Sequence, residues 1–207
     1  MTFRQALTDT LRWIPHHFPR LGFLILISAL LSNLEGMLIT QFSEQVILMI
    51  VIAVILTTPQ AFLLLLTLKL IQKPELSFSQ WMEESIPFFP RILGGTLLYV
   101  AFVTVGGLLF LLPGIYFGIQ FLFYGQFIIF RNETIADAFQ DSKELSQHYF
   151  FPLLGIWFFA LLPVLLLGGL SPYTPFPLNI GIDLVSSALT IGGVIYFSLW
   201  FKNNSIE

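Results

Sequence analysis

The sequence predicts an all-α membrane protein in which six transmembrane helices form one bundle, with short amphipathic helices at its cytoplasmic face. Of its 207 residues, 56% are hydrophobic and only 10% are charged, against roughly 45–50% and about 25% in soluble domains. Long apolar runs follow one another along the whole chain. All nine lysines and arginines fall on one side of the membrane in the six-span arrangement. Residues 1–207 are therefore predicted to be a single transmembrane domain.

The predicted spans are defined by the length that a helix needs to cross the hydrocarbon core. About 20 apolar residues are needed, because ~30 Å is covered at about 1.5 Å per residue. Five runs approach or exceed this length, and a sixth, 115–130, is shorter. The six spans are 21–38, 46–70, 92–112, 115–130, 150–170 and 181–201.

The third and fourth spans are separated only by Pro113-Gly114. A single helix over 92–130 would be about 58 Å long, nearly twice the thickness of the hydrocarbon core. Proline and glycine are also the residues that most often end a helix and allow a turn. We therefore predict a tight hairpin of two spans with its turn at these two residues.

The orientation follows from the basic residues. They precede the first span, lie around the second and fourth connections, and follow the sixth span: Arg4, Arg12, Arg20, Lys69, Lys73, Arg91, Arg131, Lys143 and Lys202. Connections rich in lysine and arginine stay in the cytoplasm. Both termini are thus expected on the cytoplasmic side.

Three segments beside the cytoplasmic ends of the spans have amphipathic patterns, at 2–15, 74–89 and 132–147. In the third, Asn132 is the expected N-cap, and Ala138, Ser142 and Leu145 form one stripe of a helix. One interpretation is that these helices pack against the inner rim of the bundle. The other is that they form a docking surface for a partner or a lipid headgroup.

The stretch 111–154 carries a resemblance to a known family. It is LLPGIYFGIQFLFYGQFIIFRNETIADAFQDSKELSQHYFFPLL, in which a Pro-Gly-Ile turn opens a short span and a helix follows with Ala138, Ser142 and Leu145. This pattern resembles the YciC-like family of uncharacterised bacterial inner-membrane proteins. It is more distantly similar to the membrane domain of some glycerophosphodiester phosphodiesterases. The resemblance implies the bacterial inner membrane and a six-span architecture, and it implies no reaction.

Polar side chains at membrane depth are the candidates for function, since placing them there costs free energy. Glu35 lies in the outer part of the first span near Asn33, Glu44 follows in the next loop, and Asp183 opens the sixth span. One interpretation places these acids in water or at helix ends, where Asp183 interacts favourably with the helix dipole. The other is a cation or proton site facing an outer vestibule, with Glu35 as its main residue.

Other polar and small residues lie inside the spans. The segment Thr57-Thr58-Pro59-Gln60 predicts a kink, which is either a tolerated irregularity or a hinge with Gln60 as a substrate contact. Gln120 and Gln126 are each expected to form a hydrogen bond with a neighbouring helix. Four glycine pairs are expected at close helix contacts: Gly94-Gly95, Gly106-Gly107, Gly168-Gly169 and Gly192-Gly193.

No set of catalytic residues is evident, so we expect a protein that is not an enzyme and holds no cofactor or metal. There are no cysteines, and the three histidines do not recur at metal-ligand spacing. A net charge of −3 does not favour a nucleic-acid partner.

Three functional hypotheses remain. The first is a protein that maintains the envelope by handling or sensing lipid, with membrane lipids as its partners. The second is an accessory or assembly subunit that binds other membrane proteins. The third is a small-solute or ion transporter that uses Glu35 and Gln60.

Overall fold

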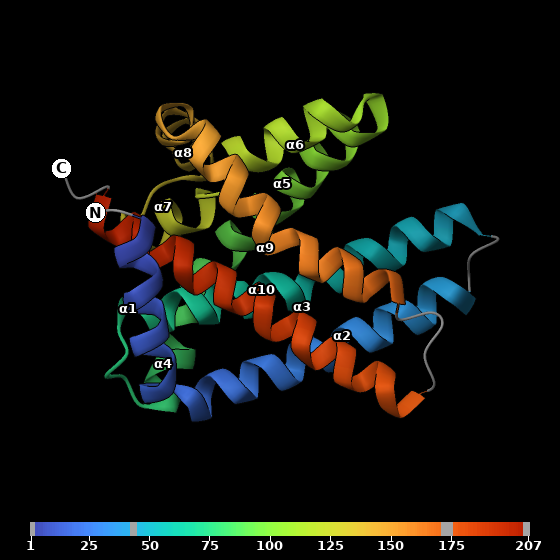
Figure 1. The fold of residues 1–207 in the computed structure, drawn as a ribbon, viewed down its shortest axis with the longest axis horizontal. Helices are drawn as coiled ribbons and strands as arrows, with labels where there is room; N and C mark the ends of the chain where they lie inside the picture. Colours follow the sequence, from blue (N-terminus) through green and yellow to red (C-terminus); the bar gives the residue numbers. More distant parts are fainter. Residues whose placement is uncertain (1–2, 42–44, 171–175, 205–207) are drawn as a thin grey trace.

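The computed structural model describes residues 3–41, 45–170 and 176–204, and within these ranges every regular element is a helix (Figure 1). The helices are α1 Phe3–His16, α2 Phe18–Gln41, α3 Val46–Gln72, α4 Phe78–Ser85, the 3-10 turn η1 Ile86–Phe88, α5 Phe89–Leu109, α6 Leu111–Gln120, α7 Tyr124–Phe130, α8 Ile135–His148, α9 Phe150–Leu170 and α10 Phe176–Asn204. The prediction of an all-α fold is therefore confirmed.

Five stretches among the described residues are long and apolar enough to cross a membrane. They are Phe18–Leu38, Val54–Gln72, Phe78–Leu109, Leu112–Phe130 and Ile180–Lys202. Each contains or overlaps one of the predicted spans. Three of the helices that carry them, α2, α3 and α10, extend beyond these limits.

The turn between α5 and α6 lies at Phe110, so the prediction of a turn at Pro113-Gly114 is wrong. Phe110 is extended, with φ −161° and ψ 148°, and it ends α5 and precedes α6. Pro113 lies in the first turn of α6. The backbone N–H groups of that turn have no intrahelical partner, so a proline without an N–H fits there at little cost.

The glycines of this hairpin allow α5 and α6 to pack backbone to backbone. A Cβ on Gly114 would lie 2.8 Å from the Cα and N of Gly107, and a Cβ on Gly106 would lie 2.9 Å from the N of Gly114. The predicted close contact is confirmed here, and also at Gly95, where a Cβ would lie 2.8 Å from the Tyr124 ring.

The same prediction is wrong for the glycine pair of α10. A Cβ on Gly192 or Gly193 would meet no atom within 4 Å, so these glycines leave open space and do not allow a close contact. Whether a glycine pair forms a contact depends on which helix faces it, and a single sequence does not contain that information. Side-chain surroundings at Gly168-Gly169 lie outside the described residues.

The fourth predicted span is not one helix. Residues 121–123 form turns between α6 and α7, and the following α7 is almost completely buried. The break is stabilised from α8: Ser142 Oγ donates to the Gln120 carbonyl at 2.9 Å and accepts from the Phe123 N–H at 3.0 Å. A side chain from a later helix thus satisfies backbone groups that the break leaves free.

The three amphipathic segments form α1, α4 with η1, and α8. On α1 the buried residues are Ala6 and Thr10, whereas Leu7 and Leu11 are exposed, so only part of the apolar stripe packs against the bundle. On α4 the Trp81 side chain is completely buried, and its Nε1 donates to the Leu66 carbonyl of α3 at 3.0 Å.

The expected N-cap of α8 is wrong by two residues. Thr134 is the N-cap, and its Oγ1 accepts from the Asp137 N–H at 3.3 Å. Asn132 instead adopts φ 58°, a left-handed conformation that asparagine tolerates better than most residues. Its side-chain oxygen accepts from Arg91 Nη2 at 2.8 Å, which holds the turn after α7 against the start of α5.

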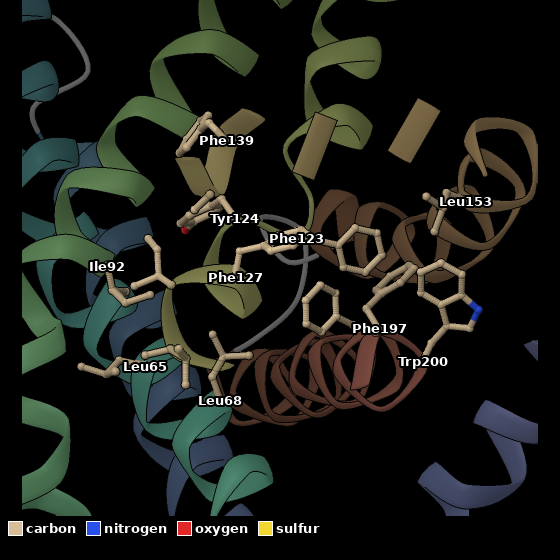
Figure 2. Packing of buried hydrophobic residues seen from close by; sticks show 14 of the residues in the cluster. Leu65, Leu68, Ile92, Phe123, Tyr124, Phe127, Phe139, Leu153, Phe197 and Trp200 are labelled. Atoms are coloured by element: carbon tan, nitrogen blue, oxygen red, sulfur yellow. The ribbon is translucent and has the colours of Figure 1, made fainter. Parts of the chain in front are cut away.

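The largest group of buried side chains surrounds the helix break. In Figure 2, Tyr124 and Phe139 lie on one side of Phe123, and Phe197 and Trp200 lie on the other. The Phe123 ring centroid is 5.4 Å from that of Trp200, and the centroids of Tyr124 and Phe139 are 5.3 Å apart. The break therefore lies in the centre of the core, where α7, α8 and α10 meet.

Candidate functional site

A cavity of about 200 Å³ lies beside the helix break, among α3, α7, α9 and α10. We call it the lateral cavity. Each of the four helices contributes to its wall, for example through Leu64, Gln126, Trp157 and Gly193. Most of the lining is apolar.

The lateral cavity has a buried floor and an exposed rim. Gly125 and Gln126 of α7 are buried, whereas Leu189 and Thr190 of α10 are exposed. The cavity therefore opens through the side of the bundle, within the apolar stretch Ile180–Lys202.

The polar groups of the lateral cavity are already paired within the protein. Gln126 Nε2 donates to Ser198 Oγ of α10 at 3.2 Å, which confirms the interhelical hydrogen bond predicted for Gln126. Thr190 Oγ1 donates to the Ser186 carbonyl at 2.9 Å. The Tyr124 hydroxyl is 2.8 Å from Thr96 Oγ1. With its polar atoms paired, the lateral cavity presents mainly carbon to a ligand.

Two glycines shape this cavity in different ways. A Cβ on Gly125 would lie 3.0 Å from Leu68 Cδ1, so this glycine allows α7 to pack closely on α3. Gly193 has open space where its Cβ would be. The first glycine brings the floor close to α3, and the second leaves the opening unobstructed.

The three residues predicted on one stripe of α8 do lie together on the face of that helix directed to the bundle. Ala138 and Ser142 are completely buried, and Leu145 is half-buried and packs against the main core. Their observed contacts are with the bundle. Ser142 also makes the two hydrogen bonds at the helix break.

Two buried polar atoms near the break have no hydrogen-bond partner among the described residues, Gln120 Nε2 and Ser146 Oγ. The side-chain hydrogen bond to a neighbouring helix that was predicted for Gln120 is thus not made through its Nε2. Its carbonyl, not its side chain, receives the hydrogen bond from α8, because the helix break turns the backbone of Gln120 towards Ser142.

Four of the polar residues within α2, α3 and α10 form two pairs. Gln60 Nε2 donates to Glu35 Oε2 at 2.8 Å, joining α3 to α2. Asn33 Nδ2 donates to Asp183 Oδ2, joining α2 to α10. We call these four residues the far-end pairs. Local sequence indicates each of these polar residues, but it does not indicate the pairings, since they join residues far apart in the chain.

The setting of Asp183 differs from the prediction. It lies two turns inside α10, which begins at Phe176, and so it does not interact with a helix N-terminus. The helix begins at Phe176 and not at the predicted residue 181. Pro177 lies in its first turn, where proline is favoured. On α3, the helix continues through Pro59 without interruption, and Gln60 is exposed apart from its contact with Glu35. Glu44 lies outside the described residues.

A cluster of charged residues precedes and follows the start of α8. Arg131 Nη1 is 3.9 Å from Glu133 Oε1 and 3.7 Å from Asp141 Oδ2. Burial raises the pKa of the Glu133 carboxyl, and the nearby Asp141 carboxylate raises it further, while Arg131 opposes both effects. Glu133 therefore holds a proton more tightly in the folded protein than in the unfolded chain.

The described residues contain no group of three histidine, cysteine, aspartate or glutamate side chains that could hold a metal ion. The Nδ1 atoms of His16, His17 and His148 each lie within 3.1 Å of the carbonyl oxygen four residues earlier. These histidines make local helix contacts.

Comparison with protein-family models, with curated proteins and with solved structures gave no match to this chain. The resemblance to the YciC-like family stays a prediction. Gly193 and Trp157 had not been recognised as functional candidates, because the cavity exists only where four helices converge.

Proposed function

We propose that this chain is a six-span protein of the bacterial inner membrane that binds phospholipid without catalysing a reaction. Its role would be in maintaining the lipid of the envelope, as the resemblance to the YciC-like family suggests. The lateral cavity is the observation that carries this proposal. In this proposal both termini lie in the cytoplasm.

The sixth span in this proposal is α9, a helix of 21 residues. Contacts between the connections support an even number of crossings. Arg20 Nη1 donates to the Pro74 carbonyl at 3.0 Å, and Arg91 Nη1 donates to the Asn132 carbonyl at 3.2 Å. These bonds bring the start of α2 and the connections after α3 and α7 to one end, where α1 also packs against α10 (Figure 1). We call this the basic end, and the positive-inside tendency places it in the cytoplasm.

The chemistry of the lateral cavity favours an acyl chain as its ligand. In a bilayer, its opening on α10 faces hydrocarbon, and lipid chains are the molecules present there at high concentration. The wall offers apolar side chains and paired polar groups. A polar solute would lose its hydration at this site and gain few hydrogen bonds in return.

The proposal is tested by a substitution that fills the lateral cavity, made at a position with room for a side chain. A Cβ at Gly193 meets no atom within 4 Å, and Gly193 lines the cavity, so the side chain of Gly193→Leu should enter it. Gly192→Leu is the matched control, because Gly192 is the adjacent glycine, has the same open surroundings and does not line the cavity. Native mass spectrometry of protein extracted gently from its own membrane would count the bound phospholipids.

We expect the wild type and Gly192→Leu to retain one more phospholipid than Gly193→Leu at the same collision energy. Equal lipid numbers in all three proteins, with equal helical circular dichroism, would overturn the assignment of the cavity. Brominated acyl chains should also quench the fluorescence of Trp157, and Trp157→Phe should remove that part of the quenching.

The same spectra distinguish the other functions. A second protein that co-purifies at a fixed stoichiometry would favour an accessory or assembly subunit. For transport, the far-end pair Glu35–Gln60 is the site to examine. Solute uptake by reconstituted protein that is lost in Glu35→Gln would favour a transporter.

A further inference from the structure

The solvent-facing side of α8 carries polar side chains in adjoining rows. Gln140, Lys143, Glu144, Gln147 and His148 all line one cleft, and they occur at helical positions i, i+3, i+4, i+7 and i+8, which lie on one face. All five residues are exposed. We call them the polar row.

The charged members of the polar row are not engaged by the protein itself. Neither Lys143 nor Glu144 makes an ion pair with the described residues. The acids on the neighbouring side of α8 do have partners within the protein. Asp141 Oδ2 lies 3.7 Å from Arg131 Nη1, and Asp137 Oδ2 accepts from Thr134 Oγ1 at 2.6 Å. The polar row thus presents one free ammonium and one free carboxylate side by side.

An aromatic wall continues from this cleft along the bundle. Phe139 and Phe121 line the cleft, and their ring centroids are 4.8 Å apart. Phe121 is 6.0 Å from Phe117 and 5.2 Å from Phe102, centroid to centroid. Phe102 lies on α5 and is 41% exposed. The wall therefore extends from the polar row into the apolar part of α5 and α6.

We propose that the polar row binds the phosphoethanolamine headgroup of a membrane phospholipid, with one acyl chain lying along the aromatic wall. Lys143 binds the phosphate, and the side-chain amides of Gln140 and Gln147 can donate to it. Glu144 accepts hydrogen bonds from the ammonium group. This inference rests on the membrane placement proposed above, but it uses a site other than the lateral cavity.

The charges select this headgroup over the alternatives. A phosphatidylglycerol headgroup is anionic and offers no ammonium to Glu144. A phosphocholine headgroup is zwitterionic like phosphoethanolamine, but its quaternary ammonium has no N–H to donate to a carboxylate. Phosphoethanolamine supplies both a phosphate and a hydrogen-bonding ammonium, matching the adjacent Lys143 and Glu144.

The experiment measures headgroup preference in the full-length protein. Protein in detergent is titrated with equimolar phosphatidylethanolamine, phosphatidylglycerol and phosphatidylcholine of identical chains, and native mass spectrometry reports the lipids retained. Lys143→Gln and Glu144→Gln are compared with two controls outside the cleft, Lys202→Gln and Glu83→Gln, which make the same changes of charge at exposed positions.

We expect the wild type and both controls to prefer phosphatidylethanolamine. Lys143→Gln should weaken its binding about fivefold, the value of one exposed charge interaction. Glu144→Gln should remove the preference over phosphatidylcholine while leaving phosphatidylglycerol binding unchanged or stronger. If neither variant alters the preference, or if the controls alter it equally, the polar row is not the headgroup site.

Two further measurements separate this inference from the proposed function. Gly193→Leu should lower the number of retained lipids without changing headgroup preference, so each site can fail independently. Soluble glycerophosphoethanolamine should compete only weakly, because it lacks the chain that contacts the aromatic wall. Full competition by this soluble headgroup would overturn the assignment to a membrane lipid.

Discussion

The two ends of the helical bundle are held together by different kinds of contact. At the basic end, side chains pair with one another, as Arg91 does with Asn132, and several also bind the backbone of other helices: Trp81 to Leu66, Gln72 to Ile129, and Ser142 to both sides of the helix break. At the far end, the Glu35–Gln60 and Asn33–Asp183 pairs are contacts between side chains, an amide with a carboxylate in each case.

This difference predicts where the stability of the protein resides. A side chain bonded to another helix's backbone fixes two main-chain segments relative to each other, and at the helix break its loss leaves the buried Phe123 N–H unsatisfied. A pair of partly exposed side chains restrains the two helices less, because both side chains can move and water can solvate the carboxylate. The basic end should therefore be rigid, and the far end should tolerate substitution.

The largest effect is expected at Trp81. Replacing this completely buried side chain in Trp81→Ala creates a cavity and removes a hydrogen bond, and we expect a loss of about 3–5 kcal/mol in the free energy of unfolding. Trp81→Phe keeps most of the packing and should lose about 1 kcal/mol. Titration with sodium dodecyl sulfate followed by circular dichroism measures both. A loss below 1 kcal/mol in Trp81→Ala would contradict a rigid basic end.

The next effect is at the helix break. Ser142→Ala leaves the Phe123 N–H buried without its acceptor, so we expect a loss of about 1–3 kcal/mol. Ser146→Ala is the matched control on the same face of α8, because the Ser146 hydroxyl is buried but unpartnered. Its effect should stay within about 0.5 kcal/mol. Equal losses in the two variants, measured by the same titration, would show that the break does not depend on Ser142.

A smaller effect that depends on pH is expected at Glu133. Its pKa is raised in the folded protein, so folding is favoured at low pH and this contribution is lost as the pH rises through the folded pKa. Glu133→Gln cannot lose a proton and should be more stable than the wild type near pH 7, by less than about 1 kcal/mol. The difference should shrink as the pH falls towards about 4. Unfolding titrations at several pH values measure this, and a difference that grows on acidification would contradict it.

The smallest effect is expected at the far end. Glu35→Gln keeps an acceptor for Gln60, and Asp183→Asn keeps one for Asn33, so each should change the free energy of unfolding by less than about 0.5 kcal/mol. If either change destabilised the protein as much as Ser142→Ala, the contrast between the two ends would be lost.

The sequence by itself determined the helical class, the approximate spans and the amphipathic segments. Hydrophobic length decides these features, and it is a local property of the chain. The same local information singled out Glu35, Gln60, Asp183 and Ser142 as polar residues in apolar or amphipathic surroundings. Their partners could not be predicted, because Gln60 binds a residue 25 positions away and Asn33 binds one 150 positions away.

Only the tertiary structure decided where helices end inside the apolar stretches, and what the small residues do there. Pro113 marked a turn in the sequence but begins a helix in the fold, since its missing N–H is harmless in a first turn. The break at 121–123 contains no proline or glycine. It is stable because Ser142 of α8 forms hydrogen bonds with backbone groups on both sides of it. The lateral cavity likewise depends on four helices meeting around Gly193, and such a meeting is a property of packing that no local pattern encodes.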